Sequence, residues 1–292
     1  MKRSTWLHLR IPFSFYLLPI FCFAVSQTPH PRLAFTLLIA IILHLLAYPA
    51  SQGFNSYYDR DQGSIGGLER PPPVSRELLV VSLAFDVVAL LLALLVGWGF
   101  AGLLLACGLA SKAYSHPAIR LKRRPWAGWL TVALFQGGVT YAMVALGASG
   151  APLRALWSRD GLVPLLVPAV LASLLVGGAY PMTQIFQHAE DAERGDLTLS
   201  LHLGVRGTFL FCRAMLGVCL LGFLAYFWTL GRPVHFLVLA AFLIPPALYL
   251  EAWLARVKRD ERQADFRSAM ALNRVSAVSL ITGFTVMAAL AR

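Results

Sequence analysis

The chain has 292 residues, of which 58% are hydrophobic and 13% carry a charged side chain, and its mean hydropathy is +0.67. This composition is typical of a multi-pass membrane protein and argues against a soluble globular one. The formal net charge of +11 would indicate nucleic-acid binding in a soluble protein. Membrane topology explains the charge here, so we expect no nucleic-acid partner.

Apolar runs of about the length that crosses a bilayer, roughly 20 residues, recur along the whole chain. They predict transmembrane helices over residues 11–27, 32–54, 78–97, 99–115, 128–148, 161–187, 207–230, 234–254 and 268–290. The predicted fold is therefore all-α, a multi-pass transmembrane helical bundle of about nine helices that forms a single domain over residues 1–292.

The first apolar run follows Lys2 and Arg3 and ends at Ala24-Val25-Ser26, a pattern also found in cleaved secretory signals. We expect this run to be retained as a helix. Its removal would leave an even number of spans and would disturb the charge balance between the two sides of the membrane.

The basic residues separate according to the loop that carries them. If the N-terminus is cytoplasmic, 20 of the 25 Lys and Arg residues fall on the cytoplasmic side. The remaining five are Arg32, Arg154, Arg159, Arg232 and Arg292. This distribution follows the positive-inside rule for an odd number of spans. It predicts an integral protein of the bacterial plasma (inner) membrane with a cytoplasmic N-terminus.

A polar, acidic segment occurs twice, over residues 48–63 and 180–195, and no gap is needed to align the copies. Tyr, Pro, Gln, Phe, Asp and Gly recur at identical positions, which is rarely a matter of chance in so short a window. The duplication predicts two pseudo-repeated halves, about 32–150 and 161–292, around a central cavity. Both copies fall on the predicted cytoplasmic side.

The polar positions in each copy have a spacing that would place them on one face of a helix. The two predicted stripes are Tyr48, Gln52, Asn55 and Asp59, and Tyr180, Gln184, Gln187 and Asp191. Polar groups at the end of a span are costly unless they face a bundle interior or a cavity. We therefore expect both stripes to point into one wet pocket.

Each copy offers an amide, a carboxylate four residues later and a second acid two residues further on. These groups are Asn55, Asp59 and Asp61 in the first copy and Gln187, Asp191 and Glu193 in the second, with Asp196 close behind. Such hard oxygen ligands suit Mg²⁺, which proteins commonly hold with a few carboxylates and the phosphates of a substrate. The alternative is that these acids are solvated loop side chains.

Candidate cations for a diphosphate lie in the same predicted cytoplasmic loops. Arg70 precedes three prolines in a glycine-rich loop that could act as a lid. Arg120 and Lys122 follow Tyr114 between the fourth and fifth spans. For the neighbouring Arg123 and Arg124 we expect a role in setting topology.

Four stretches together resemble the UbiA superfamily of intramembrane prenyltransferases, and the resemblance covers almost the whole chain. They are Asn55-x3-Asp59, Arg70-Pro-Pro-Pro, Tyr114-Ser-x-Pro-x-x-Arg120-Leu-Lys122 and Asp191-x3-Gly195-Asp-x-Thr198. The resemblance implies acidic motifs on the second and sixth helices that bind magnesium and an isoprenyl diphosphate, with the prenyl tail in a hydrophobic tunnel open to lipid.

This sequence departs from the family's acidic pattern at two positions. Gly63 stands where the first motif usually has its third acid, and Gln187 stands where the second motif usually begins with a carboxylate. Asp61 is the nearest acid that could compensate for Gly63. We therefore expect the first copy, with Asn55, Asp59 and Asp61, to be the better-equipped half of the site.

The resulting prediction is magnesium-dependent transfer of a prenyl group from a polyprenyl diphosphate to a lipophilic or aromatic acceptor within the bilayer. Asp59, Asp61 and Asp191 are the candidate catalytic residues, and Asp61 could serve either as a metal ligand or as a base. The candidate metal ligands are Asp59, Asp61, Asp191, Glu193 and Asp196, and the candidate substrate-binding residues are Asn55, Arg70, Tyr114, Arg120, Lys122 and Gln187.

An allylic carbocation would need aromatic faces and the absence of water. The candidates for this role are Phe54, Tyr57, Tyr58, Tyr114 and Phe186. Two other functions stay open. One is a UbiA-type terpene cyclase that uses no acceptor, and the other is a non-catalytic isoprenoid-binding or carrier protein.

Overall fold

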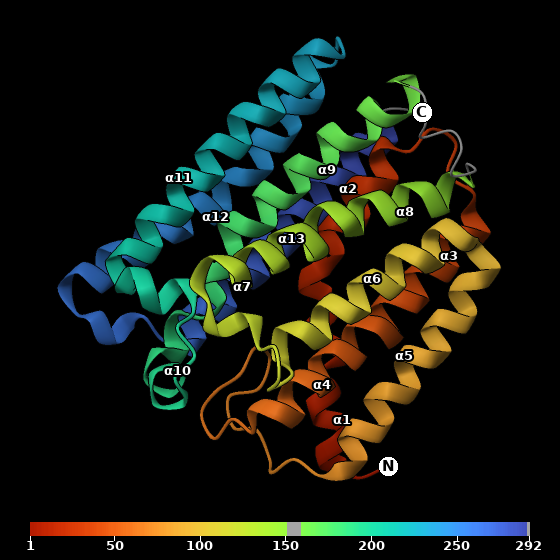
Figure 1. The fold of residues 1–292 in the computed structure, drawn as a ribbon. Coiled ribbons are helices and arrows are strands. Elements are labelled where there is room, and N and C mark those ends of the chain that lie inside the picture. The colour runs from red at the N-terminus through yellow and green to blue at the C-terminus, as the bar shows by residue number, and fades with distance from the viewer. Residues whose placement is uncertain (151–158, 291–292) are drawn as a thin grey trace.

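The computed structural model describes residues 1–150 and 159–290, and helices account for almost all of them (Figure 1). The predicted outward-facing residues Arg154 and Arg292 lie outside the described residues, as does the side chain of Arg159. Within the described ranges the helices combine into nine rods that run back and forth through one bundle.

Four rods come from the first part of the chain. The first contains α1 (Arg3–Leu9), η1 (Ile11–Leu17) and α2 (Leu18–Gln27), and the second contains α3 (Leu33–Ile41), η2 (Ile42–Ala47) and α4 (Tyr48–Asp59). The third is α5 (Arg76–Val96), and the fourth is α6 (Trp98–Ser115), which the short helix η3 (Leu121–Arg123) follows.

Five rods complete the bundle. The fifth contains α7 (Pro125–Val132), η4 (Ala133–Val139) and α8 (Thr140–Ser149), and the sixth contains α9 (Arg159–Ala179), η6 (Tyr180–Thr183), η7 (Ile185–Gln187) and α10 (His188–Arg194). The seventh is α11 (Leu199–Thr229), the eighth is α12 (Pro233–Arg259) with η8 (Glu261–Gln263) after it, and the ninth is α13 (Phe266–Leu290).

The predicted membrane-spanning architecture is confirmed. Eight of the rods in the described part of the chain are long and apolar enough to cross a membrane. The described rod outside this set is the fourth, α6, an 18-residue helix whose last turn is polar and contains Lys112. Each rod coincides with one of the nine predicted apolar runs, and several extend beyond it at the charged end. Polar residues can continue a helix beyond the hydrocarbon region, so an apolar run underestimates its length.

The core lies where the N-terminal rod meets the last rods of the chain. Phe23 on α2 is fully buried and packs at ring-centroid distances of 4.9 Å from Tyr141, 5.3 Å from Phe223 and 4.9 Å from Phe284. A smaller apolar cluster near the charged end surrounds Trp253 and includes Ile185 and Phe209. The first apolar run is therefore an integral part of this bundle.

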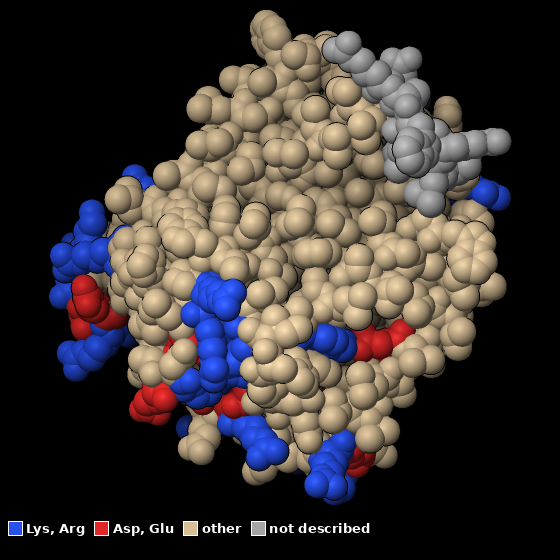
Figure 2. Space-filling view, viewed as in Figure 1, with Lys and Arg blue, Asp and Glu red and all other residues tan. Residues whose placement is uncertain are grey.

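Charged residues gather at one end of the molecule. In Figure 2 the blue and red side chains lie mainly in the lower half of the view, around α10 and the loops near it, and the upper half is almost free of them. The N-terminus lies at the charged end (Figure 1). The apolar side chains that α5 exposes, such as Val80, Val87, Leu91 and Leu95, fit a lipid-facing surface.

Candidate functional site

A cavity of about 540 Å³ begins at the charged end of the bundle and continues into its interior. All eight positions of the two predicted polar stripes line it, namely Tyr48, Gln52, Asn55, Asp59, Tyr180, Gln184, Gln187 and Asp191. From Asp59 back to Leu43, which also lines the cavity, the chain rises roughly 24 Å. The duplicated segments therefore face one continuous space.

The first copy forms a regular helix at the charged end of the cavity. Asn55 donates from Nδ2 to Asp59 Oδ2 at 2.7 Å and to Ser115 Oγ at 2.9 Å, which links α4 to the end of α6. The bond to Asp59 follows from the sequence spacing, because residues four apart lie on the same face of an α-helix. It fixes the Asp59 carboxylate at the cavity wall.

The loop after α6 places two cations against Asp59. Lys122 Nζ lies 2.7 Å from Asp59 Oδ1, and the Arg120 guanidinium lies 3.3 Å from the same oxygen. Arg120 has a left-handed backbone conformation, with φ of 45°, at the turn that begins η3. The three side chains are at most 7% exposed, so these ion pairs form away from bulk solvent.

Asp196 anchors both cations from the other side. Its carboxylate accepts two hydrogen bonds of 2.7 Å from Arg120 and lies 3.1 Å from Lys122 Nζ. Burial alone would raise the pKa of Asp196, but the hydrogen bonds from Arg120 and the charges of Lys122 and Arg120 bring its pKa below the ordinary value. Asp196 is therefore held as a carboxylate, and it does not line the cavity.

Asp61 lies just beyond the end of α4 and pairs with Arg194, the last residue of α10. Arg194 NH2 lies 2.5 Å from Asp61 Oδ1 and 2.8 Å from Glu190 Oε1. Burial, together with the nearby negative charge of Asp59, raises the pKa of Asp61, and the positive charge of Arg194 opposes this increase. The ion pair connects the two duplicated segments directly.

The second copy does not repeat the helix of the first, and the predicted second stripe on a regular helix is wrong. Its residues form two short 3₁₀ turns, η6 and η7, before α10 begins at His188. Gln187 donates from Nε2 to the backbone oxygen of Ser64 at 3.2 Å, and Asp191 accepts from Thr198 Oγ1 at 3.3 Å. Asp191 forms no ion pair with any described residue, although it lines the cavity.

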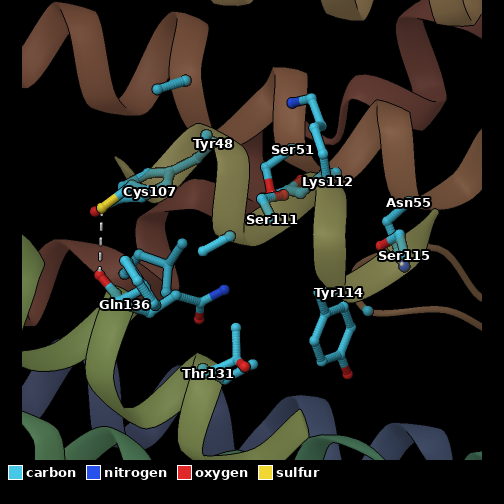
Figure 3. A pocket seen from close by; sticks show the side chains of 18 of the residues that line it. Tyr48, Ser51, Asn55, Cys107, Ser111, Lys112, Tyr114, Ser115, Thr131 and Gln136 are labelled. Carbon is cyan, nitrogen blue, oxygen red and sulfur yellow. Dashed lines mark hydrogen bonds between the residues drawn. The ribbon is translucent and has the colours of Figure 1, made fainter. Parts of the chain in front are cut away.

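The cavity becomes apolar and aromatic away from the acids. Figure 3 shows Tyr114 pointing from α6 into the space, across from Thr131 on α7 and Gln136 on η4. The hydroxyl groups of Tyr114 and Tyr180 are hydrogen-bonded to each other. The apolar and aromatic lining includes Phe13, Tyr16, Leu17, Leu43, Tyr48, Ala89, Leu90, Leu104, Phe135 and Met143.

The cavity also reaches the outer surface of the bundle. Val87 on α5 and Leu105 and Leu109 on α6 line the cavity and are 58%, 48% and 62% exposed. On the same wall, Lys112 Nζ lies 2.6 Å from Asp86 Oδ2. The interior space is therefore in contact with the face of the bundle that lipid would cover.

The structure brings most of the predicted site residues together at this cavity. Those that line it are Asn55, Asp59, Asp61, Tyr114, Lys122, Gln187 and Asp191, and Arg120 lies directly behind Asp59. Arg70 and Glu193 are exposed, and neither lines the main cavity. Of the five aromatic candidates, only Tyr114 is part of the described lining.

Several residues of the site were not predicted from the sequence. Arg194 and Glu190 lie within the duplicated segment but have no counterpart of the same charge in the first copy. Arg10 lines the cavity and donates from its guanidinium to the backbone oxygens of Gly66 and Gln52. Arg10 is one of the 20 basic residues that the sequence predicts on the cytoplasmic side, and nothing in its immediate sequence separates it from Lys2 and Arg3.

The donor set fits a magnesium ion that a substrate helps to hold. Among residues 1–150 and 159–290, no three His, Cys, Asp or Glu side chains are grouped so that they could hold a metal by themselves. The cavity wall nevertheless presents the carboxylates Asp59, Asp61 and Asp191 and the amides Asn55 and Gln187. Mg²⁺ usually binds one or two carboxylates plus substrate phosphates and waters, so an incomplete protein cage is what such a site needs.

Comparisons with known proteins agree with this architecture. The sequence matches the UbiA prenyltransferase family over residues 13–275. A search of the curated proteins found no match.

Solved structures of similar fold cover nearly the whole chain. A UbiA homolog from Archaeoglobus fulgidus bound to DMAPP and Mg²⁺ superposes with a TM-score of 0.70 at 17% identity, covering 98% of this chain and 99% of that chain. The apo structure of a UbiA homolog from Aeropyrum pernix K1 gives a TM-score of 0.67 at 22% identity, with coverage of 98% and 99%. At these identities the likeness shows the fold, and the family match over residues 13–275 shows that the chain belongs to the UbiA prenyltransferase family.

Proposed function

We propose that this protein transfers a prenyl group from a polyprenyl diphosphate to a lipophilic or aromatic acceptor within the membrane, with magnesium as cofactor. The observation that carries this proposal is that both acidic segments line one cavity, charged at one end and apolar along its depth. A diphosphate suits the charged end, and an isoprenoid tail suits the apolar part. The homolog from Archaeoglobus fulgidus was solved with GPP and Mg²⁺ and with DMAPP and Mg²⁺, which supports the same substrate class here.

The charged end can bind and neutralise a diphosphate. Arg10, Lys122 and Arg194 line the cavity there and face the carboxylates Asp59, Asp61 and Asp191. When bound, magnesium would supply Lewis-acid neutralisation of the charge that develops on the leaving diphosphate. Asp59 and Asp191 are the proposed ligands, with Asn55 and Gln187 as neutral oxygen donors, whereas Asp61 is paired with Arg194. Glu193, Asp196 and Arg70 stay predictions, because none of them lines this cavity.

The proposed reaction begins when the bond between the allylic carbon and the diphosphate oxygen breaks and its electron pair leaves with the diphosphate. The fixed cations oppose the charge that develops on the oxygens. The rings of Tyr48, Tyr114 and Tyr180 line the adjacent wall, where they can face a carbocation and exclude water. The acceptor then supplies an electron pair to the carbocation and loses a proton, for which Asp61, with its raised pKa, is the proposed base.

The distribution of basic residues supports a proposal for the placement in the membrane. We propose that the charged end faces the cytoplasm of a bacterial cell, because 20 of the 25 Lys and Arg residues were predicted to lie on that side. A prenyl chain would then enter from the bilayer through the wall at Val87, Leu105 and Leu109. Its diphosphate would remain at the cytoplasmic membrane surface.

The test is an assay with purified protein in lipid nanodiscs and radiolabelled prenyl diphosphates of several chain lengths, with and without Mg²⁺ and candidate acceptors. We expect acceptor-dependent product and diphosphate release that Asp59→Ala and Asp191→Ala both abolish. Arg213→Gln is the matched control, because Arg213 pairs with Glu251 at 2.9 Å on a half-exposed surface away from the cavity.

Three other results would contradict the proposal in different ways. Diphosphate release that needs no acceptor would identify a terpene cyclase. Saturable binding without release would identify a non-catalytic isoprenoid-binding or carrier protein. Diphosphate release that neither Asp59→Ala nor Asp191→Ala changes would mean that the reaction does not take place at this cavity.

A further inference from the structure

Arg194 lies between two carboxylates at the boundary of the cavity. It bridges Asp61 and Glu190, at 2.5 and 2.8 Å, through the same guanidinium nitrogen. That nitrogen is shielded from solvent, and the Asp61 side chain is only 5% exposed. Arg194 lines both the main cavity and a smaller outer pocket that contains Glu190 and Gly63. A positive charge is thus held where two acids from different segments meet.

Glu190 occupies the space that a side chain at position 63 would need. Its Oε1 accepts from the backbone N–H groups of Gln62 at 2.8 Å and Gly63 at 3.4 Å. A Cβ on Gly63 would lie 2.8 Å from Glu190 Oε2. The absence of a side chain at position 63 therefore lets an acid from the second segment reach the end of the first. The position of Glu190 in the second segment therefore depends on the glycine at position 63 of the first segment.

The carboxylates of Asp61 and Glu190 both contact the Arg194 guanidinium, as two carboxylate ligands would both contact one metal ion. Arginine remains charged at all physiological pH values, and its planar set of donors matches carboxylate and phosphate oxygens. Metal binding by Asp61 and Glu190 would have to displace Arg194, whose shared nitrogen is shielded from solvent. Asp191, in contrast, lines the cavity without an ion-pair partner among the described residues, so it remains available to a metal.

We propose that Arg194 takes the place of a metal ion at the Asp61–Glu190 end of the site, so that a bound prenyl diphosphate needs a single magnesium ion, held near Asp191 and Asp59. This inference rests on the proposed function. Arg194 provides permanent charge to one side of the diphosphate, and the metal provides charge to the other. Gly63 and Glu190 position the guanidinium, and they do so without contributing a metal ligand.

The experiment counts metal ions without turnover. Mn²⁺ replaces Mg²⁺, and its electron paramagnetic resonance signal measures free ion during titration of the full-length protein in nanodiscs with a non-hydrolysable geranyl thiolodiphosphate. We expect one bound Mn²⁺ per bound analogue in the native protein and two in Arg194→Gln, because the substitution frees Asp61 and Glu190. The Mn²⁺ concentration at half-saturation of analogue binding should rise by about tenfold or more in the variant.

Two further variants separate charge from general disruption. Arg194→Lys keeps a cation and should retain one bound Mn²⁺, and Arg213→Gln should match the native protein in both readouts. Two or more Mn²⁺ ions in the native protein would overturn the proposal, as would an unchanged count in Arg194→Gln. If Arg194→Gln does not fold, the native and Arg194→Lys counts decide. Absence of analogue binding by the native protein would instead contradict the proposed function.

Discussion

The two duplicated segments are identical at six of their 16 positions and chemically similar at three more, but they differ in backbone. The first begins with the regular helix α4, which follows the π-helical turn η2, whereas the second breaks into η6, η7 and α10. Each copy has a proline at its second residue, Pro49 or Pro181, which lacks the N–H that a continuous α-helix would use. All four polar positions of both copies nevertheless line the cavity. Cavity-facing side chains were retained in the duplication, and helical regularity was not.

The acids of the two segments also differ in their charged partners. In the first, Asp59 is neutralised by Lys122 and Arg120, and Asp61 by Arg194. In the second, the Thr198 hydroxyl is the side-chain partner that Asp191 has among the described residues. The sequence led us to expect the first copy to be the better-equipped half for metal. The charge environment favours the opposite assignment, with the first copy as the charge-balanced wall and the second as the source of the available carboxylate.

The largest expected effect concerns Asp196, which directly follows the second segment and binds the two cations that pair with Asp59. Asp196→Asn should lower the free energy of unfolding by about 3–5 kcal/mol, because it leaves Arg120 and Lys122 buried with one acid fewer. Denaturation in mixed micelles measures this change, and Glu251→Gln is the control. If Asp196 is instead a metal ligand, as the sequence predicted, the variant will lose Mg²⁺ affinity and keep most of its stability.

The Asp196 contribution should also depend on pH in a definite direction. The pKa of Asp196 is lowered in the folded protein from its ordinary value of 3.8. Its stabilising contribution is therefore complete above that ordinary value and is lost as the pH falls through the folded pKa. The stability difference between the native protein and Asp196→Asn should be constant between about pH 7 and pH 5 and should shrink only in stronger acid. A difference that shrinks near neutral pH would contradict this account.

The next effect compares the equivalent acids Asp59 and Asp191. Asp59→Asn should destabilise the fold by about 1.5–3 kcal/mol because it removes charge-assisted contacts with Lys122 and Arg120. Asp191→Asn should leave stability nearly unchanged and should still abolish Mg²⁺-dependent binding of a prenyl diphosphate. Thermal unfolding and isothermal titration calorimetry on both variants separate the two effects. An equal loss of stability in the two variants would contradict the distinction between a charge-paired Asp59 and an Asp191 without an ion pair among the described residues.

The equivalent glycines Gly63 and Gly195 should respond differently to substitution. Gly195 ends α10 with φ of +70°, and a Cβ added there would meet no atom of the described chain within 4 Å apart from its own chain neighbours. Gly195→Ala should therefore cost about 1–2 kcal/mol through backbone strain alone, and Gly195→Asn should cost less. Gly63→Ala should displace Glu190 without comparable strain. Unfolding measurements that show the two alanine variants to be equivalent would contradict this distinction.

The course of the helices could be predicted because bilayer thickness sets the length of an apolar run, and each rod contains one such run. The convergence of the duplicated segments could be predicted because polar side chains in a membrane protein must find a polar interior. The pairing of Arg194 with Asp61 could not be read from spacing. It depends on how the loop after α4 folds over α10, through contacts such as Gln187 with Ser64. Composition also gave no reason to separate Arg10 from its basic neighbours.

The smallest expected effect concerns Arg70, which follows the first segment but lies exposed and outside the cavity lining. Its loop is attached to α13 by Glu69 and Arg267, 3.0 Å apart, and exposed charges at a distance from the cavity are largely screened by salt. Arg70→Gln should therefore weaken prenyl diphosphate binding by about threefold or less, whereas Lys122→Gln should weaken it far more. Fluorescence titration at low and high ionic strength measures both. If Arg70→Gln weakens prenyl diphosphate binding tenfold or more at high salt, the loop must fold over the bound diphosphate. Arg70 would then contact the substrate directly, as the sequence predicted.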